Sequence, residues 1–198
     1  MNQKWYNIDI SEIFIEVYKA FPAKMVNRDD IELSNSIILP PSALKTLSEM
    51  KWFKDTKNPI LFRILNIELN LQLFCGVADF TAEKGMCYIP TNIFDSLRLM
   101  EGQMINLRNA RLNQGTFIKL QPHKTSFLNT PDPKTIVRHN LKKFFCLTKG
   151  ETISVKYENK IYKLDVIECK PESGISNFNN NLKIELCPAK DYKEPTKD

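Results

Sequence analysis

The chain has 198 residues, of which 42% are hydrophobic and 26% are charged, with a formal net charge of +5. These values are typical of a globular protein with a hydrophobic core, and the length suits one large domain or two small lobes. No apolar run approaches the roughly 20 residues that span a bilayer, and the N-terminus carries acidic residues where a signal peptide is apolar, so direct membrane insertion is not expected.

The first half of the sequence contains an internal repeat. The segment Ile38–Leu47 can be laid over the segment Tyr88–Leu97 without a gap, at an offset of 50 residues. Each copy predicts a short apolar strand, a proline and a short helix, since proline is tolerated at the first helical position. The pattern predicts strands over 60–65 and 104–107 as well, with a turn at Glu101-Gly102 before the second. Two copies are too few for a solenoid and indicate a barrel of approximate two-fold symmetry.

The second half changes character at its prolines. The stretch 122–133 is rich in proline and predicts a linker between two lobes. The pattern then predicts a helix over 134–145, a hairpin of strands 152–157 and 161–167, and a last strand over 182–186. We therefore expect a lead-in over 1–33 that holds the first barrel strand, a barrel lobe over 34–121, an α/β lobe over 134–190 and a frayed polar tail over 191–198.

The basic excess of the chain lies in its second part. Residues 1–120 hold 14 basic and 13 acidic side chains, whereas residues 121–198 hold 14 and 10. A nucleic-acid patch around Arg138, Lys142, Lys143 and Lys149 is one interpretation, and a solvated helix face is the other. No aromatic residues alternate with these basic ones as in RNA-binding motifs, so no nucleic-acid partner is expected.

The residue types that carry catalysis or bind metals do not form a recognisable set. The cysteines are odd in number and widely spaced, without C-x-x-C, which argues against a zinc site or a disulfide framework and favours reduced thiols: Cys75, Cys87, Cys146, Cys169 and Cys187. His123 and His139 accompany no protease-like signature, and the six glycines form no phosphate-binding loop. We expect no enzyme activity, no metal and no cofactor, and therefore a binding module.

A set of short motifs carries a family resemblance. In the first half these are Ile38 to Leu44, Leu61-Phe62, Cys75 to Val77 with Phe80, and Tyr88 to Pro90. In the second half they are Lys119 to Pro122, Phe127-Leu128, Pro133-Lys134, Cys146 to Gly150, Tyr162, Lys170-Pro171 and Tyr192 to Pro195. In their order and spacing, from Ser34 to Pro195, they resemble the N-terminal domain of the ubiquitin fusion degradation protein 1 family.

The resemblance implies a fold and a function. The fold is mixed β/α, a double-psi β-barrel followed by a smaller α/β lobe. The implied function is that of a non-enzymatic adaptor that binds ubiquitin or polyubiquitin and delivers ubiquitinated proteins to an AAA+ unfoldase, including in ER-associated degradation. Nuclear protein localisation protein 4 and the ATPase valosin-containing protein are the implied partners, through segments beyond this chain. The implied location is the cytoplasm with recruitment to the endoplasmic reticulum.

The resemblance also points to candidate ubiquitin contacts, which are Phe178, Asn179, Asn181 and Glu168. The chain departs from the family where Phe178 to Asn181 stand in place of an acidic stretch. Because the ubiquitin surface is partly basic, this loss of acid predicts a weaker site. Ser34 to Ser36 and Asn92 to Phe94 also differ from the family. The departures leave open a second interpretation, a scaffold of a plastid protein-import complex with reduced ubiquitin recognition.

Overall fold

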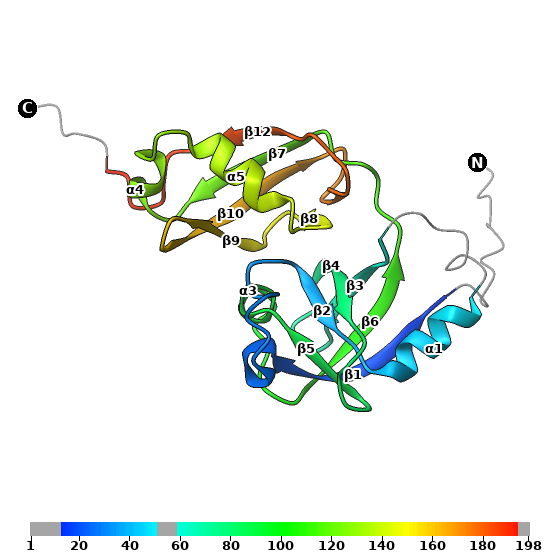
Figure 1. Cartoon of the computed structure of the whole chain (residues 1–198). Helices are drawn as coiled ribbons and strands as arrows, with labels where there is room; N and C mark the ends of the chain where they lie inside the picture. Colours follow the sequence, from blue (N-terminus) through cyan, green and yellow to red (C-terminus); the bar gives the residue numbers. More distant parts are fainter. Residues whose placement is uncertain (1–12, 51–58, 194–198) are drawn as a thin grey trace, which may run out of the picture.

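A computed structural model describes residues 13–50 and 59–193 and shows two lobes joined side by side (Figure 1). The first lobe is built around a closed barrel of six strands in the order β1-β5-β2-β4-β3-β6. Its elements are β1 (Ile15–Pro22), η2 (Ala23–Val26), β2 (Ser36–Ile38), α1 (Pro41–Glu49), β3 (Leu61–Asn66), β4 (Leu71–Asp79), β5 (Met86–Ile89), α3 (Thr91–Ser96) and β6 (Gln103–Ala110).

The strand pairing of the barrel has the symmetry that the repeat predicts. Strands β1 and β5 pair in parallel, as do β4 and β2, while β1 with β6 and β4 with β3 pair antiparallel. The two remaining contacts, β2 with β5 and β3 with β6, join equivalent strands. Exchanging β1-β2-β3 for β4-β5-β6 therefore leaves the pairing unchanged, and the fold class is confirmed as a mixed β/α fold with a double-psi β-barrel.

The two strand-proline-helix units of the repeat are present. Strand β2 leads through Pro40 into α1, and β5 leads through Pro90 into α3, with each proline at the helix N-cap. Leu47 of α1 and Leu97 at the C-cap of α3 are equivalent in the repeat and are buried in the same core. Burial of one apolar face on each helix is what holds these short helices, which would not be stable alone.

The second lobe is a four-stranded sheet in the order β12-β7-β10-β9 with a two-stranded sheet of β11 and β8 beside it. Helix α5 lies over the four-stranded sheet (Figure 1). The elements are β7 (Phe117–Pro122), α4 (Thr125–Leu128), α5 (Pro133–Leu141), β8 (Cys146–Thr148), β9 (Thr152–Tyr157), β10 (Lys160–Lys170), β11 (Gly174–Ser176) and β12 (Lys183–Leu186).

The boundary between the lobes lies before β7, and not in the proline-rich stretch 122–133. Strand β7 pairs with β10 and β12, so it belongs to the second sheet and not to the barrel. The passage between the sheets is residues 111–116, and α4 lies inside the expected linker 122–133. The sequence does not reveal this, because the alternation in β7 fits a strand of either sheet.

Two further expectations differ in extent. Helix α5 stops at Leu141 and not at 145, because the chain turns there to enter β8, and Asn177 Nδ2 donates to the carbonyl oxygens of Leu141 and Phe144 at 2.8 and 3.0 Å. Strand β10 continues to Lys170 because it pairs with β7 beyond the hairpin. In the tail, Asp191 accepts hydrogen bonds from Thr125, whereas residues 194–198 lie outside the described part of the chain.

The lobes meet through β4 of the barrel and β8 of the second lobe. Asn35 lies in this contact, and it is fully buried. Close approach is allowed by Gly76, since a Cβ there would lie 2.5 Å from Phe145 Cδ2. The Phe74 N–H donates to Thr148 Oγ1 at 3.1 Å, which ties strand β4 to β8 directly. In the described residues no helix is long and apolar enough to cross a membrane.

Candidate functional site

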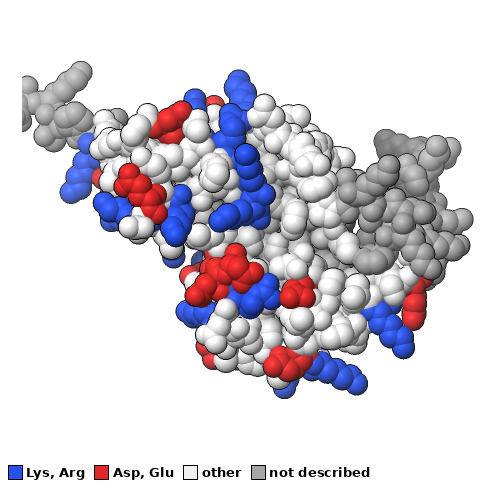
Figure 2. Space-filling model, in the orientation of Figure 1, with Lys and Arg blue, Asp and Glu red and all other residues white. Residues whose placement is uncertain are grey.

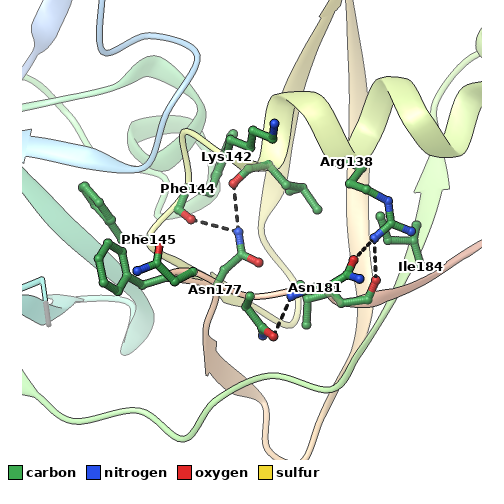
Figure 3. A pocket seen from close by; sticks show the side chains of 12 residues that line it. Arg138, Lys142, Phe144, Phe145, Asn177, Asn181 and Ile184 are labelled. Atoms are coloured by element: carbon green, nitrogen blue, oxygen red, sulfur yellow. Dashed lines mark hydrogen bonds between the residues drawn. The ribbon is translucent and has the colours of Figure 1, made fainter.

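A cavity of about 470 Å³ lies on the second lobe between helix α5 and the segment that runs from β11 into β12 (Figure 3). Its lining combines apolar, amide and basic side chains, and no acidic residue contributes to it. The lining residues are Arg138, Leu141, Lys142, Phe144, Phe145, Asn177, Phe178, Asn179, Asn180, Asn181, Leu182 and Ile184.

Helix α5 supplies one wall of the cavity. Its start is fixed by Asp132, whose side chain accepts from the Thr135 N–H at 3.1 Å, and by proline at the next position. Val137 and Leu141 are buried against the sheet, while Arg138 is exposed on the side that faces β12. Arg138 Nη1 donates to Asn181 Oδ1, and to the Leu182 carbonyl oxygen at 3.3 Å.

The loop between β11 and β12 forms the opposite rim, and its backbone is held from several sides. Asn177 caps the end of α5, as described above, and its N–H donates to the Phe145 carbonyl oxygen at 2.8 Å. Asn180 Nδ2 donates to the Gly115 carbonyl oxygen at 2.6 Å, and Gln114 Nε2 donates to the Phe178 carbonyl oxygen at 2.9 Å. The loop is therefore organised before any ligand binds.

The cavity floor is apolar and one end of it is aromatic. Leu141, Phe144, Leu182 and Ile184 are all buried. The rings of Phe145 and Phe178 lie 6.3 Å apart at an interplanar angle of 48°, a tilted arrangement that favours edge contacts. A ligand in this cavity would meet apolar surface below and polar groups at the rim.

The electrostatics of the site are positive. Arg138 and Lys142 are both exposed at the rim, and Figure 2 shows Lys and Arg side chains gathered over the face that α5 covers. Glu185 of β12 is the next residue along the chain after Ile184 of the cavity lining. Its carboxylate pairs with Lys119 Nζ at 2.7 Å, and this pairing lowers the pKa of Glu185. Glu185 alternates with the buried Ile184, so its side chain lies on the other face of the sheet.

The structure brings together three of the four residues that the sequence nominates. Phe178, Asn179 and Asn181 line the cavity. Glu168 does not, because it follows a register shift in the middle of β10 and pairs with Lys119 of the neighbouring strand. Its carboxylate lies 3.4 Å from Lys170 Nζ, in a row of charges on the sheet.

Sequence reasoning missed the contribution of α5 to this site. From the sequence, Arg138 and Lys142 indicate only a nucleic-acid patch or a solvated face, although their four-residue spacing places them on one side of a helix. That spacing was the available signal. Asn177 and Phe145 gave none, because their role depends on chain segments far apart in sequence.

Four of the five cysteines are buried and His123 is paired, whereas Cys187 is partly exposed and His139 is exposed. Burial raises the pKa of the thiols of Cys75, Cys87, Cys146 and Cys169. His123 Nε2 lies 2.6 Å from Asp165 Oδ1, and the same carboxylate pairs with Lys190, so this cluster ties the segment after β12 to the sheet. In residues 13–50 and 59–193, no three His, Cys, Asp or Glu side chains are grouped as metal ligands.

Comparison with known proteins matches both lobes. The family "Ubiquitin fusion degradation protein UFD1, N-terminal subdomain 1" matches residues 14–113, and its subdomain 2 matches residues 114–189. Both ranges agree with the lobes that the strand pairing defines.

Curated relatives extend the match over most of the chain. The "Ubiquitin fusion degradation protein 1 homolog" of Dictyostelium discoideum is 38% identical over 181 residues, covering 90% of this chain and 54% of the relative. The human "Ubiquitin recognition factor in ER-associated degradation protein 1" is 34% identical over 92% of this chain and 59% of its own length. For the "Ubiquitin fusion degradation protein 1" of Saccharomyces cerevisiae the values are 30%, 95% and 53%. The chain thus spans a little over half the length of these relatives, and it belongs to the ubiquitin fusion degradation protein 1 family.

Proposed function

We propose that this chain is a non-enzymatic recognition domain that binds ubiquitin or ubiquitin chains and delivers ubiquitinated proteins to an AAA+ unfoldase. The observation that carries the proposal is the match of both lobes to the ubiquitin fusion degradation family, including a relative named as a ubiquitin recognition factor in ER-associated degradation. The loop Phe178 to Asn181 is the proposed contact, with Glu168 as an outlying member on the sheet.

The chemistry of the described residues supports a binding role. A cysteine nucleophile acts as the thiolate, and burial raises the pKa of four of the five thiols. The imidazole of His123 is hydrogen-bonded to Asp165, and Asp165 also accepts from Thr152 Oγ1 at 2.8 Å. The partners of this histidine are therefore side chains that hold the sheet together, and none of them is a cysteine nucleophile.

The proposal extends to partners and location. Nuclear protein localisation protein 4 and valosin-containing protein would be engaged by segments outside this chain, in the cytoplasm and at the endoplasmic reticulum. The basic rim formed by Arg138 and Lys142 favours the second candidate, a scaffold of a plastid protein-import complex, because a basic rim disfavours a partly basic ubiquitin surface. Ubiquitin binding separates the two.

The direct test is a two-dimensional NMR titration of the chain with monomeric ubiquitin and with ubiquitin chains. We expect a dissociation constant on the order of 0.1–1 mM for the monomer, as for small transient interfaces. Chains should bind only a little more tightly, because the rim of the second lobe repels them although tethering favours a second contact. Absence of any shift with either ligand would contradict the recognition proposal and favour the scaffold.

The charge of the loop gives a second test. We expect the double variant Asn179→Glu and Asn181→Asp to bind ubiquitin chains several-fold more tightly at low salt, with a smaller gain at 0.5 M because exposed charges are screened over a few ångströms there. Position 179 should contribute more, since a carboxylate at 181 would pair with Arg138 where the amide does now.

The matched control for this variant is on the barrel. Asn70 is exposed and left-handed, with φ of 52°, as Asn179 is with φ of 49°, and Gln72 is an exposed neighbour. Asn70→Glu with Gln72→Asp adds the same charge far from the loop. Calorimetry should show no gain for it, and equal gains for both double variants would mean that the loop is not part of the ubiquitin site.

A further inference from the structure

The cavity borders an open strand edge, because Ile184 of β12 contributes to its lining. Strand β12 is at one end of the four-stranded sheet and pairs with β7 alone among the described strands. The other end strand, β9, has its edge engaged by the barrel, where the Thr152 N–H donates to Ser96 Oγ at 3.3 Å. The sheet therefore presents its unpaired backbone at β12.

The groups that face outward on this edge can be identified. The N–H groups of Lys183 and Cys187 donate to Thr116 and Leu120, toward β7. Because backbone direction alternates along a strand, Ile184 and Leu186 direct their N–H and carbonyl groups to the open side. The Ile184 side chain meanwhile lines the cavity.

Helix α5 runs antiparallel to the loop that leads into β12, and hydrogen bonds at two levels show the alignment. Arg138 bonds Asn181 and Leu182, and at the end of the helix Leu141 accepts from Asn177. The helix thus lies beside the loop that leads into β12, and it crosses the sheet toward β9, where Asn140 exchanges two hydrogen bonds with the backbone of Lys156.

The wall carries a basic stripe, which we define as Lys134, Arg138 and Lys142. The three are exposed and spaced by four residues, so they lie on one side of the helix, and Arg138 and Lys142 line the cavity. The stripe extends about 12 Å at 1.5 Å per residue. The hydrogen bond of Arg138 to the Leu182 carbonyl oxygen places the middle of the stripe at the residue before β12.

We propose that the cavity and the open edge of β12 together bind an extended acidic peptide segment of a partner protein, which adds to the edge of β12 as a further strand. Main-chain hydrogen bonds to Ile184 and Leu186 hold the peptide, one of its apolar side chains enters the cavity, and flanking carboxylates meet the basic stripe. The apolar floor and the absence of acid in the lining select this ligand over a basic one. The site goes beyond ubiquitin recognition, and its charge preference is the opposite.

The test uses a blocked synthetic peptide in which aspartates flank an isoleucine and a leucine, with the neutral asparagine analogue beside it. We expect the acidic peptide to bind with a dissociation constant on the order of 10–100 µM and the neutral analogue about tenfold more weakly. Amide shifts and protection from hydrogen exchange should centre on Ile184 and Leu186. A peptide N-methylated at alternate residues should lose binding, since it cannot pair with the edge.

Variants of the stripe separate this site from general charge effects. Arg138→Glu should weaken the acidic peptide by about tenfold or more. The control Lys160→Glu changes the charge equally at the first residue of β10, two strands from β12, and should have little effect. Because Arg138 is exposed, a well-dispersed spectrum for the variant will verify its fold.

The outcomes are distinct from those for ubiquitin. Asn179→Glu with Asn181→Asp should weaken the acidic peptide while it strengthens ubiquitin chains, so one proposal can fail while the other stands. The peptide site would be overturned by any of three results. These are equal weakening by Arg138→Glu and Lys160→Glu, amide shifts centred away from β12, and equally tight binding of single-stranded RNA.

Discussion

Replacing Asn35 with alanine is expected to lower the free energy of unfolding by about 3 kcal/mol or more. The Asn35 side chain both donates and accepts a hydrogen bond across the contact between the lobes. Its Nδ2 donates to the Cys146 carbonyl oxygen at 2.5 Å, and its Oδ1 accepts from the Phe145 N–H at 3.1 Å. Alanine leaves both backbone groups buried without these bonds and opens a cavity between the lobes.

Chemical denaturation followed by far-ultraviolet circular dichroism measures the change. Asn113 is the matched control, because its amide bonds only the exposed carboxylate of Glu172, at 2.8 Å. Asn113→Ala should cost less than about 0.5 kcal/mol. A similarly small loss for Asn35→Ala would show that other contacts, such as the hydrogen bond between Phe74 and Thr148, hold the lobes together.

Stability is expected to fall between pH 5 and pH 8 because of one buried carboxyl group. Glu151 is 1% exposed, and one oxygen accepts from the Thr148 N–H at 2.9 Å while the other has no partner. Burial raises its pKa to about 8. Three buried thiols interact electrostatically with this carboxyl group. They belong to Cys75, Cys146 and Cys169, and their raised pKa values keep them neutral over this pH range.

The direction follows from proton binding. Below the ordinary glutamate pKa both the folded and unfolded states are protonated, and the stability is fully present. Above the ordinary glutamate pKa the unfolded chain releases this proton while the folded protein keeps it. The free energy of unfolding therefore falls as the pH rises, until the folded protein also releases the proton near its pKa of about 8. At about 1.4 kcal/mol for each unit, the loss from pH 5 to pH 8 is on the order of 3 kcal/mol.

The variant Glu151→Gln isolates this contribution. Its amide oxygen can still accept from Thr148 but cannot titrate, so the difference between wild type and variant should favour the variant increasingly toward pH 8. At pH 5 the variant should be no more stable than wild type, because its amide nitrogen has no buried acceptor in place of the unpartnered oxygen. Denaturation curves at pH 5, 6.5 and 8 supply the measurement.

A surface carboxylate provides the comparison. Glu68 is exposed in the turn between β3 and β4, and Glu68→Gln should leave the pH dependence of the wild type unchanged. If wild type and Glu151→Gln lose stability in parallel, other groups cause the dependence and Glu151 is solvated in solution.

Local features of the fold could be predicted from the sequence by itself. The strand-proline-helix units at an offset of 50 residues are present at Pro40 and Pro90, and the hairpin of β9 and β10 is where alternation places it. The start of α5 at Pro133, behind Asp132, was also predictable. These features depend on caps, turn residues and periodicity, which act over a few residues and are therefore written in short stretches of sequence.

Only the tertiary structure decided which distant segments meet. Strand β7 belongs to the second sheet because its partners are β10 and β12, more than 40 residues onward, and alternation in one strand does not name its partner. The cavity likewise joins α5 to the loop before β12. The sequence named Phe178, Asn179 and Asn181, but the basic wall opposite them required the fold.

The two residues expected to affect stability most were beyond the reach of sequence patterns. Asn35 and Glu151 are polar residues in polar surroundings along the chain, and residues of these types usually lie on the surface. Asn35 is buried where the two lobes meet, and Glu151 is buried behind β8, where its carboxyl group accepts from Thr148. Composition and periodicity thus determined two lobes and their local elements, whereas long-range packing decided the interface, the cavity and the open edge of β12.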